Sequence, residues 1–378
     1  TIHAGDTHRM VYPFLGVLLH SIGGLAAGSF YIPFRKVKTW AWESYWLIQG
    51  VLAWVVMPSL VSALTIPSFL TVFSGIELKT IALVYLFGVL WGIGGLTFGL
   101  SMRYLGMSLG YAVALGFCAA VGTLVPPIIE GRFLALWTSA SGLAILGGVL
   151  ICLAGIAVCG YAGIRKEREL SDEEKKETIR EFALVKGFAV AIFAGVLSGC
   201  MAIAFHFGKP IAQAALDNHA REIFTNNPVF VVAMAGGFTT NCIWCLILNF
   251  KNKSIGDYAS GPRDALAANY FFAGLAGVIW YGQFFFYGMG TTQMGAYDFS
   301  SWTIHMAFII VFSNLWGIRF REWKGVTQRT LRFVYMGIFI LILSTVVVGY
   351  GNYLAPDTAA SVEQTETSGN RSNPAAEQ

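Results

Sequence analysis

Two titratable side chains, Asp298 and His305, lie seven residues apart in an otherwise apolar stretch of the chain. A spacing of seven residues places both side chains on one face of an α-helix. A carboxylate and an imidazole on that face can carry a proton or bind the hydroxyl groups of a ligand. Because a carboxylate is costly inside a bilayer, it usually marks a functional pathway there. The pair therefore predicts proton coupling if this stretch lies in a membrane.

Aromatic and amide side chains flank that pair. Trp302 shares its face, and a preceding run places Trp280, Gln283, Phe284 and Tyr287 at helical spacings of three, four and seven residues. Aromatic rings can stack on the apolar C–H faces of a pyranose, and amide, imidazole or carboxylate groups can pair with its hydroxyls. The stretch therefore predicts a sugar-binding site.

Four further polar residues are candidates for transport chemistry. His20 lies in a glycine-rich apolar run with Tyr31 on about the same face, which favours proton or sugar binding; a structural histidine is the alternative. Glu43 begins the next apolar run, and either forms a gate ion pair with a basic residue or caps a helix in solvent. Arg103 ends a third run, where it either contributes to a gate or extends to the membrane surface.

The cysteines do not predict a metal centre or a redox site. All six lie in apolar runs, and Cys242 and Cys245 form a CxxC pair with no other cysteine or histidine close in sequence. We interpret them as small apolar packing residues. We expect no cofactor, no metal and no enzymatic activity, since no cluster of ligands or nucleophiles is present in the sequence.

The composition indicates an integral membrane protein. The chain has 378 residues, of which 56% are hydrophobic and only 12% charged, whereas soluble domains are about 25% charged. Many apolar runs reach the roughly 20 residues that cross a bilayer as a helix. We predict an all-α fold with ten transmembrane helices over residues 12–34, 44–65, 80–102, 107–128, 141–162, 184–207, 229–249, 267–289, 296–317 and 333–353.

The basic residues predict the orientation of these helices. If the N-terminus lies outside, nineteen of the 25 lysine and arginine residues fall in inner loops. Cytoplasmic loops are enriched in lysine and arginine, so both termini are predicted to be periplasmic in a bacterial inner membrane. The net charge of +4 therefore reflects topology and not nucleic-acid binding. His206 and Lys209 are unusual, because they lie near the outer face.

The charge pattern also divides the chain. Ser171 and Glu174 match a capping box, which predicts a short cytoplasmic helix between two halves. The predicted segments are an N-terminal segment (1–11), a first five-helix repeat (12–162), a charged cytoplasmic linker (163–183), a second five-helix repeat (184–353) and a disordered tail (354–378).

The two halves share a sequence pattern. Trp91 is followed by glycines eight and fifteen residues later, and Trp280 is followed by glycines at the same two spacings. Both patterns cross from the third predicted helix of a half into the fourth. Because each half has five helices, the second must cross the membrane in the opposite sense, as in the inverted repeats of secondary transporters. The repeat adds Trp91 to the predicted sugar site, although the first half carries Leu109 and Gly116 where the second has Asp298 and His305.

Several long motifs resemble one known family. The segments FYIPFRKVKTWAWE, MRYLGMSLG, WYGQFFFYG and AYDFSSWTIHM are similar to those of the bacterial L-rhamnose–proton symporter family, in the drug/metabolite transporter superfamily. The resemblance covers nearly all of 12–353. It implies uptake of L-rhamnose, or a related sugar, driven by inward proton flow. Polar positions of the family's motifs are matched by His20, Tyr31, Glu43, Arg103, Gln283, Asp298 and His305, whereas the resemblance gives no role to His206.

Other functions are compatible with parts of this pattern. A member of the same superfamily carrying a different small metabolite, as an exporter of metabolites or drugs, is the main alternative. A membrane enzyme, a receptor and a channel are less compatible with the residues present. The oligomeric state is left open. If Asp298 carries the proton, Asp298→Asn is predicted to abolish proton-driven uptake while some sugar binding remains.

Overall fold

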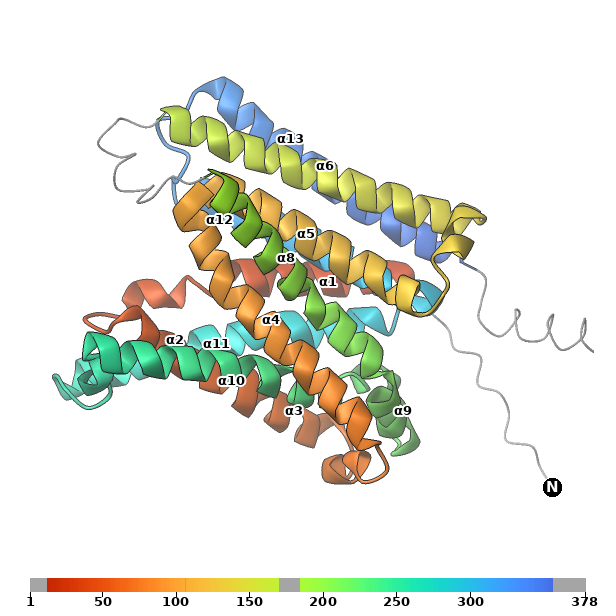
Figure 1. Ribbon diagram of the computed structural model, residues 1–378, viewed down its shortest axis with the longest axis horizontal. Coiled ribbons are helices and arrows are strands. Elements are labelled where there is room, and N and C mark those ends of the chain that lie inside the picture. Colours follow the sequence, from red (N-terminus) through yellow and green to blue (C-terminus); the bar gives the residue numbers. More distant parts are fainter. Residues whose placement is uncertain (1–11, 106, 170–183, 356–378) are drawn as a thin grey trace, which may run out of the picture.

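A computed structural model describes residues 12–105, 107–169 and 184–355, and every regular element in those ranges is helical (Figure 1). Ten segments within them are long and apolar enough to cross a membrane, which confirms the predicted number. The elements are α1 (Pro13–Ser29), η1 (Pro33–Lys36), α2 (Trp42–Gly50), η2 (Val51–Val56), α3 (Met57–Thr65), η3 (Phe69–Phe73), α4 (Leu78–Leu105), α5 (Met107–Ile129), η4 (Leu134–Trp137), α6 (Ala140–Glu169), α8 (Leu184–Phe207), α9 (Lys209–Asp217), η5 (Glu222–Phe224), α10 (Asn227–Asn252), η6 (Ser254–Tyr258), α11 (Arg263–Thr291), η7 (Gly295–Ser300), α12 (Ser301–Arg319) and α13 (Gln328–Tyr353).

The first residues of the predicted charged linker are helical. Helix α6 continues to Glu169, because the polar residues after 162 extend the helix beyond its apolar part instead of ending it. The remaining linker, with the proposed cap at Ser171 and Glu174, lies outside the described residues. The predicted N-terminal segment and most of the predicted tail also lie outside them.

The bundle has two distinct ends. At one end, called the basic end here, α6 and α12 finish with Lys166, Arg168 and Arg319 in their last turns. It lies to the left in Figure 1. The opposite end carries α9 and the 3₁₀ elements η3, η5 and η7, together with the last residues of α13. The positions of the candidate site residues are given below relative to these two ends.

Glycines allow the central helices to approach one another closely. Helix α1 packs against α11 and α12, and α8 packs against α4 and α5. A Cβ atom built on Gly24 of α1 would collide with Phe308 of α12, and one built on Gly94 of α4 would lie 2.5 Å from the backbone nitrogen of Ser198 in α8. Small residues at such contacts are typical of membrane helices, so these glycines determine how closely the helices pack.

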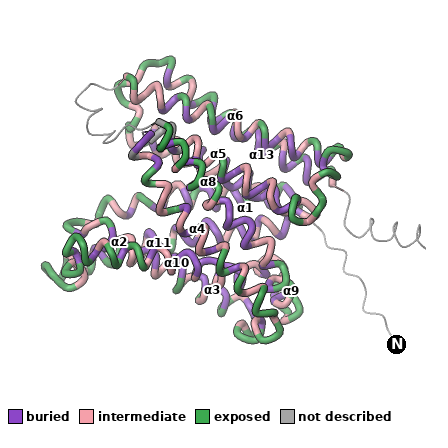
Figure 2. Tube along the Cα trace, viewed as in Figure 1, coloured by how far each residue is buried: buried purple, intermediate pink, exposed green. Residues whose placement is uncertain are grey.

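The burial pattern is that of a membrane bundle. Helices α6 and α13 lie side by side along one edge (Figure 1) and expose large apolar side chains, including Leu150 and Phe339. Helix α1 passes through the interior, and one of its faces is buried (Figure 2). A helix satisfies its own backbone hydrogen bonds, so apolar side chains can face lipid while polar ones are kept for the interior. The buried polar side chains are therefore the ones to explain.

Candidate substrate and proton site

Two buried histidines meet in the interior of the bundle. His20 of α1 and His305 of α12 have ring centroids 6.2 Å apart. The Tyr287 ring of α11 lies 5.3 Å from His20 and 5.2 Å from His305. Both histidines are completely buried and Tyr287 is 4% exposed. The fold therefore joins two residues that are 285 positions apart in sequence through a third helix.

The imidazole nitrogens of this pair are unpaired. None of the four ring nitrogens of His20 and His305 has a hydrogen-bond partner in the described part of the chain. Leaving a buried polar group unpaired costs about 1–3 kcal/mol, so the arrangement favours any ligand that supplies donors or acceptors here. Two adjacent positive rings would repel each other. The pair is therefore suited to hold one proton at a time.

Two glycines make room for these rings. A Cβ atom built on Gly290 of α11 would lie 2.9 Å from both Cε1 and Nε2 of His20, closer than atoms normally approach. One built on Gly23 of α1 would lie 2.8 Å from the carbonyl oxygen of Gln283 and 3.4 Å from Cε1 of His305. The positions of the two imidazoles therefore depend on backbone that a larger residue would displace.

Aromatic side chains enclose the pair. Trp302 is fixed by a hydrogen bond from its Nε1 to the carbonyl oxygen of Cys118, 3.1 Å away, and any Cβ on Gly122 of α5 would collide with its ring. Its N–H is thus occupied, and only the ring faces remain for a ligand. Phe205 of α8 lies 5.2 Å from Tyr287, with an interplanar angle of 32°. These rings form apolar walls of the kind that a pyranose requires.

The predicted face of α11 is confirmed as a buried stripe. Trp280, Gln283, Phe284 and Tyr287 are all buried. Trp280 lies 5.8 Å from Trp91 of α4, so the two tryptophans equated by the sequence pattern contact each other. The predicted sugar-site residues of this stripe therefore extend from the histidine pair toward the basic end.

A pocket reaches this stripe from the opposite end of the bundle. It is lined by Gly122, Pro126, Ala202, Phe205, His206, Lys209, Asn226, Tyr287, Thr291, Asp298 and Phe299. Thr291 donates its hydroxyl to the Tyr287 carbonyl, and Asn226 donates its amide to the Gly288 carbonyl, each at 2.9 Å. The hydroxyl proton of Thr291 and one amide hydrogen of Asn226 are therefore occupied, which leaves both side-chain oxygens to accept from a ligand and the second amide hydrogen of Asn226 to donate to one. Tyr287 belongs both to this pocket and to the histidine cluster.

A second pocket lies near the basic end between α5, α6 and α12. Its lining is mostly apolar, with Lys166 5.0 Å from the centre of the Trp323 ring. None of the site residues predicted from the sequence lines it. It therefore contributes no part of the candidate site.

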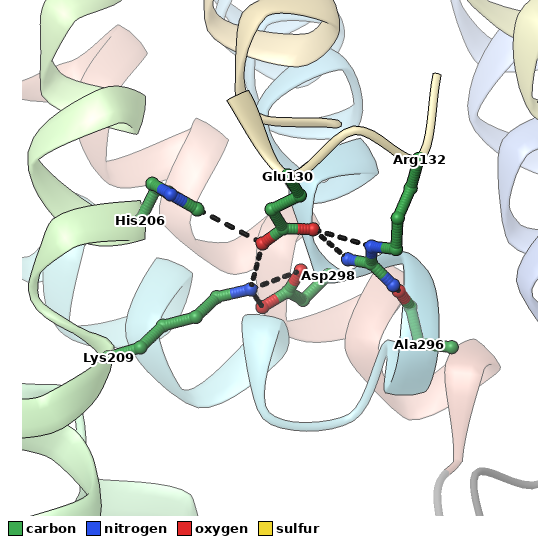
Figure 3. A network of polar contacts seen from close by, with 6 residues as sticks. All are labelled: Glu130, Arg132, His206, Lys209, Ala296 and Asp298. Atoms are coloured by element: carbon green, nitrogen blue, oxygen red, sulfur yellow. Dashed lines mark hydrogen bonds and ion pairs between the residues drawn. The ribbon is translucent and has the colours of Figure 1, made fainter. Parts of the chain in front are cut away.

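Charged side chains form the wall of the first pocket. Lys209 of α9 lies between two carboxylates, with its Nζ 2.9 Å from Glu130 Oε1 and 3.2 Å from Asp298 Oδ2 (Figure 3). Glu130 follows α5 and Asp298 lies in η7, so one ammonium group joins three segments. Separating these segments requires breaking the ion pairs.

Glu130 is the centre of this outer ionic network, which comprises Glu130, Arg132, His206, Lys209 and Asp298. Arg132 donates through Nε at 2.7 Å and His206 Nδ1 lies 3.0 Å away; Arg132 also donates to the Ala296 carbonyl (Figure 3). Burial alone would raise the pKa of the Glu130 carboxyl. The hydrogen bonds from His206, Lys209 and Arg132 outweigh that effect and hold its pKa well below the usual range. Glu130 is therefore ionised at any physiological pH.

The predicted position of Asp298 is wrong. It does not lie in the α-helix of His305, because it belongs to the 3₁₀ element η7 and α12 begins only at Ser301. Asp298 lies at the mouth of the pocket, with 27% of its side chain exposed and Lys209 as its partner. It is thus separate from the histidine pair.

The structure also separates the other candidates. Tyr31 lies beyond the end of α1, is 55% exposed and contacts Trp46, so it does not share a cavity wall with His20. Glu43 is buried, but it accepts hydrogen bonds from Ser254 at 2.6 Å and Asn252 at 2.9 Å and not from a basic side chain. The side chain of Arg103 lies outside the described residues.

Four residues of the outer ionic network were missed by the sequence analysis. Glu130, Arg132, His206 and Lys209 take part in its close contacts, yet none was assigned a role. The available signal was the unusual position of His206 and Lys209 near the predicted outer face. Glu130 and Lys209 are 79 positions apart, and nothing in the sequence pairs them.

Ten membrane-spanning segments, a buried polar centre and a pocket closed by ion pairs define a multi-pass membrane protein of the transporter class. A family model described as "L-rhamnose-proton symport protein (RhaT)" matches residues 11–354, and the chain belongs to that family. Proteins named "L-rhamnose-proton symporter" from Yersinia pestis (strain Pestoides F) and Pectobacterium atrosepticum are each 37% identical to it over 340 residues. These alignments cover 89% of this chain and 97% of each relative.

Proposed function

We propose that this protein imports L-rhamnose together with protons by alternating access. Two lines support the substrate: the names of its relatives, and a site in which aromatic rings surround unpaired polar atoms. The single observation that carries the proposal is the pair His20 and His305, which is completely buried and whose ring nitrogens have no partner among the described residues. Such a pair can accept a proton and can bind the hydroxyls of a sugar.

We assign the proton to the histidine pair, within the set of candidates Asp298, His305, His20 and Glu43. Asp298 is neutralised by Lys209, and Glu43 is held by two hydrogen bonds, so neither requires a proton. His20 and His305 have no such partners. A proton on either ring would gain a ligand oxygen as an acceptor, which couples sugar binding to protonation.

We place the sugar against Tyr287, Trp302 and the faces of Trp280 and Trp91. Gln283 lies on the same buried stripe of α11, and its amide complements the imidazoles as a hydrogen-bonding group. The outer pocket supplies the access route, because Tyr287 lines both spaces. The gate at that end is the outer ionic network, whereas the gate candidates from the sequence were Glu43 and Arg103.

The remaining architecture is also part of this proposal. We propose a location in the bacterial inner membrane with the basic end in the cytoplasm and the termini in the periplasm, as the loop charges favour. We further propose two inverted five-helix repeats and membership of the drug/metabolite transporter superfamily. The packing supports the repeat: α1 contacts α11 and α12, and the equivalent α8 contacts α4 and α5, while α6 contacts its own equivalent α13.

The experiment is uptake of labelled L-rhamnose by proteoliposomes under an imposed pH gradient. The expected result is accumulation that depends on the gradient and collapses when a protonophore is added. Liposomes without protein are the control for passive entry. Uptake that is indifferent to the gradient would contradict proton coupling, and absence of L-rhamnose uptake alongside transport of another metabolite would contradict the substrate.

A further inference from the structure

A second group of unpaired polar atoms lies outside the histidine cluster. Gln49, near the end of α2, is completely buried, and neither its amide oxygen nor its amide nitrogen has a partner in the described residues. Trp54 in η2 is 4% exposed, and its indole N–H also lacks an acceptor there. Unpaired buried groups cost about 1–3 kcal/mol each. Two such side chains five residues apart need an explanation other than packing.

The local backbone folds Trp54 back over the turn that contains Gln49. Residues Val51–Val56 form a π-helix, the wider helical turn that often occurs at functional sites. Pro58 follows it and has no N–H to donate to the carbonyl of Trp54, four residues earlier, so the α-helical pattern cannot continue through this turn. A Cβ atom built on Gly50 would lie 2.8 Å from Cζ3 of Trp54. The indole therefore lies over Gly50, the residue that follows Gln49 in the chain.

Two other tryptophans face this indole. The ring centroid of Trp54 is 5.3 Å from that of Trp280 and 6.0 Å from that of Trp91, both in edge-on arrangements. Trp91 belongs to α4 and Trp280 to α11, so three helices contribute one ring each. The group combines hydrogen-bonding atoms with ring surfaces, which is the same chemistry as the histidine cluster.

We propose that Gln49, Trp54, Trp91 and Trp280 form a second sugar subsite, and that the Gln49 amide and the Trp54 N–H select the hydroxyls of the transported sugar. The inference rests on the proposed function, since it assigns the same substrate to these residues. In this arrangement the subsite is closed: a Cβ atom on Gly277 of α11 would lie 2.6 Å from the backbone oxygen of Gln49. The sugar reaches it when η2 and α11 separate.

A line of aromatic contacts leads from this subsite to the basic end. Trp54 contacts Trp46 at 6.1 Å, and Trp46 stacks on Trp42 at 5.2 Å and on Tyr31 at 6.2 Å. Trp42 and Tyr31 are exposed. The subsite therefore lies between the histidine pair and an exposed aromatic surface, as expected of a step in sugar release.

The first test uses Gln49→Leu, which preserves the approximate volume and removes the unpaired amide. If the amide serves only a ligand, the sugar-free variant is expected to melt at a higher temperature than the wild type, because a buried unpaired group has been removed. The thermal stabilisation by L-rhamnose is expected to be lost. A packing role for Gln49 predicts a lower melting temperature, which would overturn the proposal.

The second test measures equilibrium binding of labelled L-rhamnose, with its monodeoxy analogues as competitors, to the purified full-length protein. Trp54→Phe keeps an aromatic ring and removes the N–H. We expect about tenfold weaker binding of L-rhamnose, but no change for the analogue that lacks the hydroxyl bound by that N–H. Trp244→Phe is the matched control, because Trp244 is 44% exposed on α10 and should bind as the wild type does.

The outcomes distinguish this subsite from the transport function. If the wild-type protein binds and takes up L-rhamnose, two results would overturn the subsite and leave the proposed function intact. One is an equal loss of affinity for every analogue in a variant. The other is no loss of affinity in either variant. A wild-type protein that neither binds nor transports L-rhamnose would overturn both. A loss that is confined to one hydroxyl position supports the assignment.

Discussion

The outer ionic network and the histidine pair are both clusters of titratable side chains, but they differ in what their polar atoms contact. In the network, Glu130 and Asp298 are paired with basic groups at 3.2 Å or less, and Lys209 is 45% exposed. In the centre, His20 and His305 are completely buried, and their ring nitrogens have no partners in the described residues.

This difference separates two functions that the sequence had combined. Charges that already neutralise one another have no need of a transported proton, although breaking their pairs can open a pocket. Unpaired buried groups gain a large free energy from a proton or a ligand hydroxyl. We therefore expect the network to govern access and the histidine pair to govern coupling.

The largest expected effect comes from substituting the two buried histidines, His20 and His305. His305→Gln and His20→Gln retain hydrogen-bonding side chains but cannot carry a proton. Loss of a charge-assisted hydrogen bond of 1.5–3 kcal/mol predicts an approximately hundredfold lower gradient-driven accumulation of L-rhamnose. Exchange of labelled for unlabelled sugar at equal pH should be retained, because it requires no net proton movement.

The measurement is the accumulation ratio with and without a pH gradient, compared with exchange in the same vesicles. His219→Gln is the control. His219 follows α9 at the end of the bundle opposite the basic end and lies outside both clusters. Wild-type accumulation in both histidine variants would assign the proton to another group. The proposed division between a network that governs access and a histidine pair that governs coupling would then be wrong. Loss of exchange as well as accumulation would indicate damage to sugar binding and not to coupling alone.

The next effect concerns access. The sequence predicted that Asp298→Asn would abolish proton-driven uptake, but the ion pair with Lys209 leads us to expect a rate only about two- to fivefold slower, with the accumulation ratio retained. Partly exposed ion pairs contribute about 1 kcal/mol or less. Lys209→Met breaks both of its pairs, so it should hold the pocket open more often than Asp298→Asn.

Labelling measures this opening. Thr291→Cys places a reactive thiol in the pocket lining, and a membrane-impermeant maleimide added at that end should label it faster in the Lys209→Met background. Lys79→Met is the matched control, since Lys79 starts α4 at the same end and lies outside the network. Unchanged labelling together with slower uptake would indicate that Lys209 contacts the sugar itself.

Much of the fold was predictable because helix formation in a membrane depends on local composition. The ten spans, the buried stripe of α11 and the close packing at Gly24 follow from apolar length, helical periodicity and small residues. Helix α6 runs past its predicted membrane span as far as Glu169, because hydropathy records the membrane boundary and a helix can continue into water.

The site was predictable only in part. His20, His305 and Tyr287 were chosen correctly as buried groups, because a polar residue in an apolar run is conspicuous. Asp298 was misplaced, since the chain forms a 3₁₀ element over Gly295–Ser300 and the α-helix that holds His305 begins only at Ser301. The contact between Glu130 and Lys209 depends on how α5 and α9 meet in space, and no spacing in the sequence encodes it.

The smallest expected effect is on the stability contributed by Glu130 and its dependence on pH. Because the folded-state pKa of Glu130 is depressed, its stabilising contribution is fully present above the ordinary glutamate pKa of about 4.3 and is lost as the pH falls through the lower folded value. Glu130 therefore keeps its charge between pH 5 and 8. Glu130→Gln should lower the melting temperature by about 2–3 °C, equally at pH 6 and pH 8.

The same variant should leave the midpoint of the pH–uptake profile unchanged, whereas His305→Gln should flatten that profile. The groups facing Glu130 are Arg132, His206 and Lys209, and only the histidine ordinarily titrates in this range. A destabilisation by Glu130→Gln that is larger at pH 6 and becomes equal at both pH values in a His206→Gln background would assign proton binding to His206. In that case the access network would itself sense pH, and the division between access and coupling would be wrong.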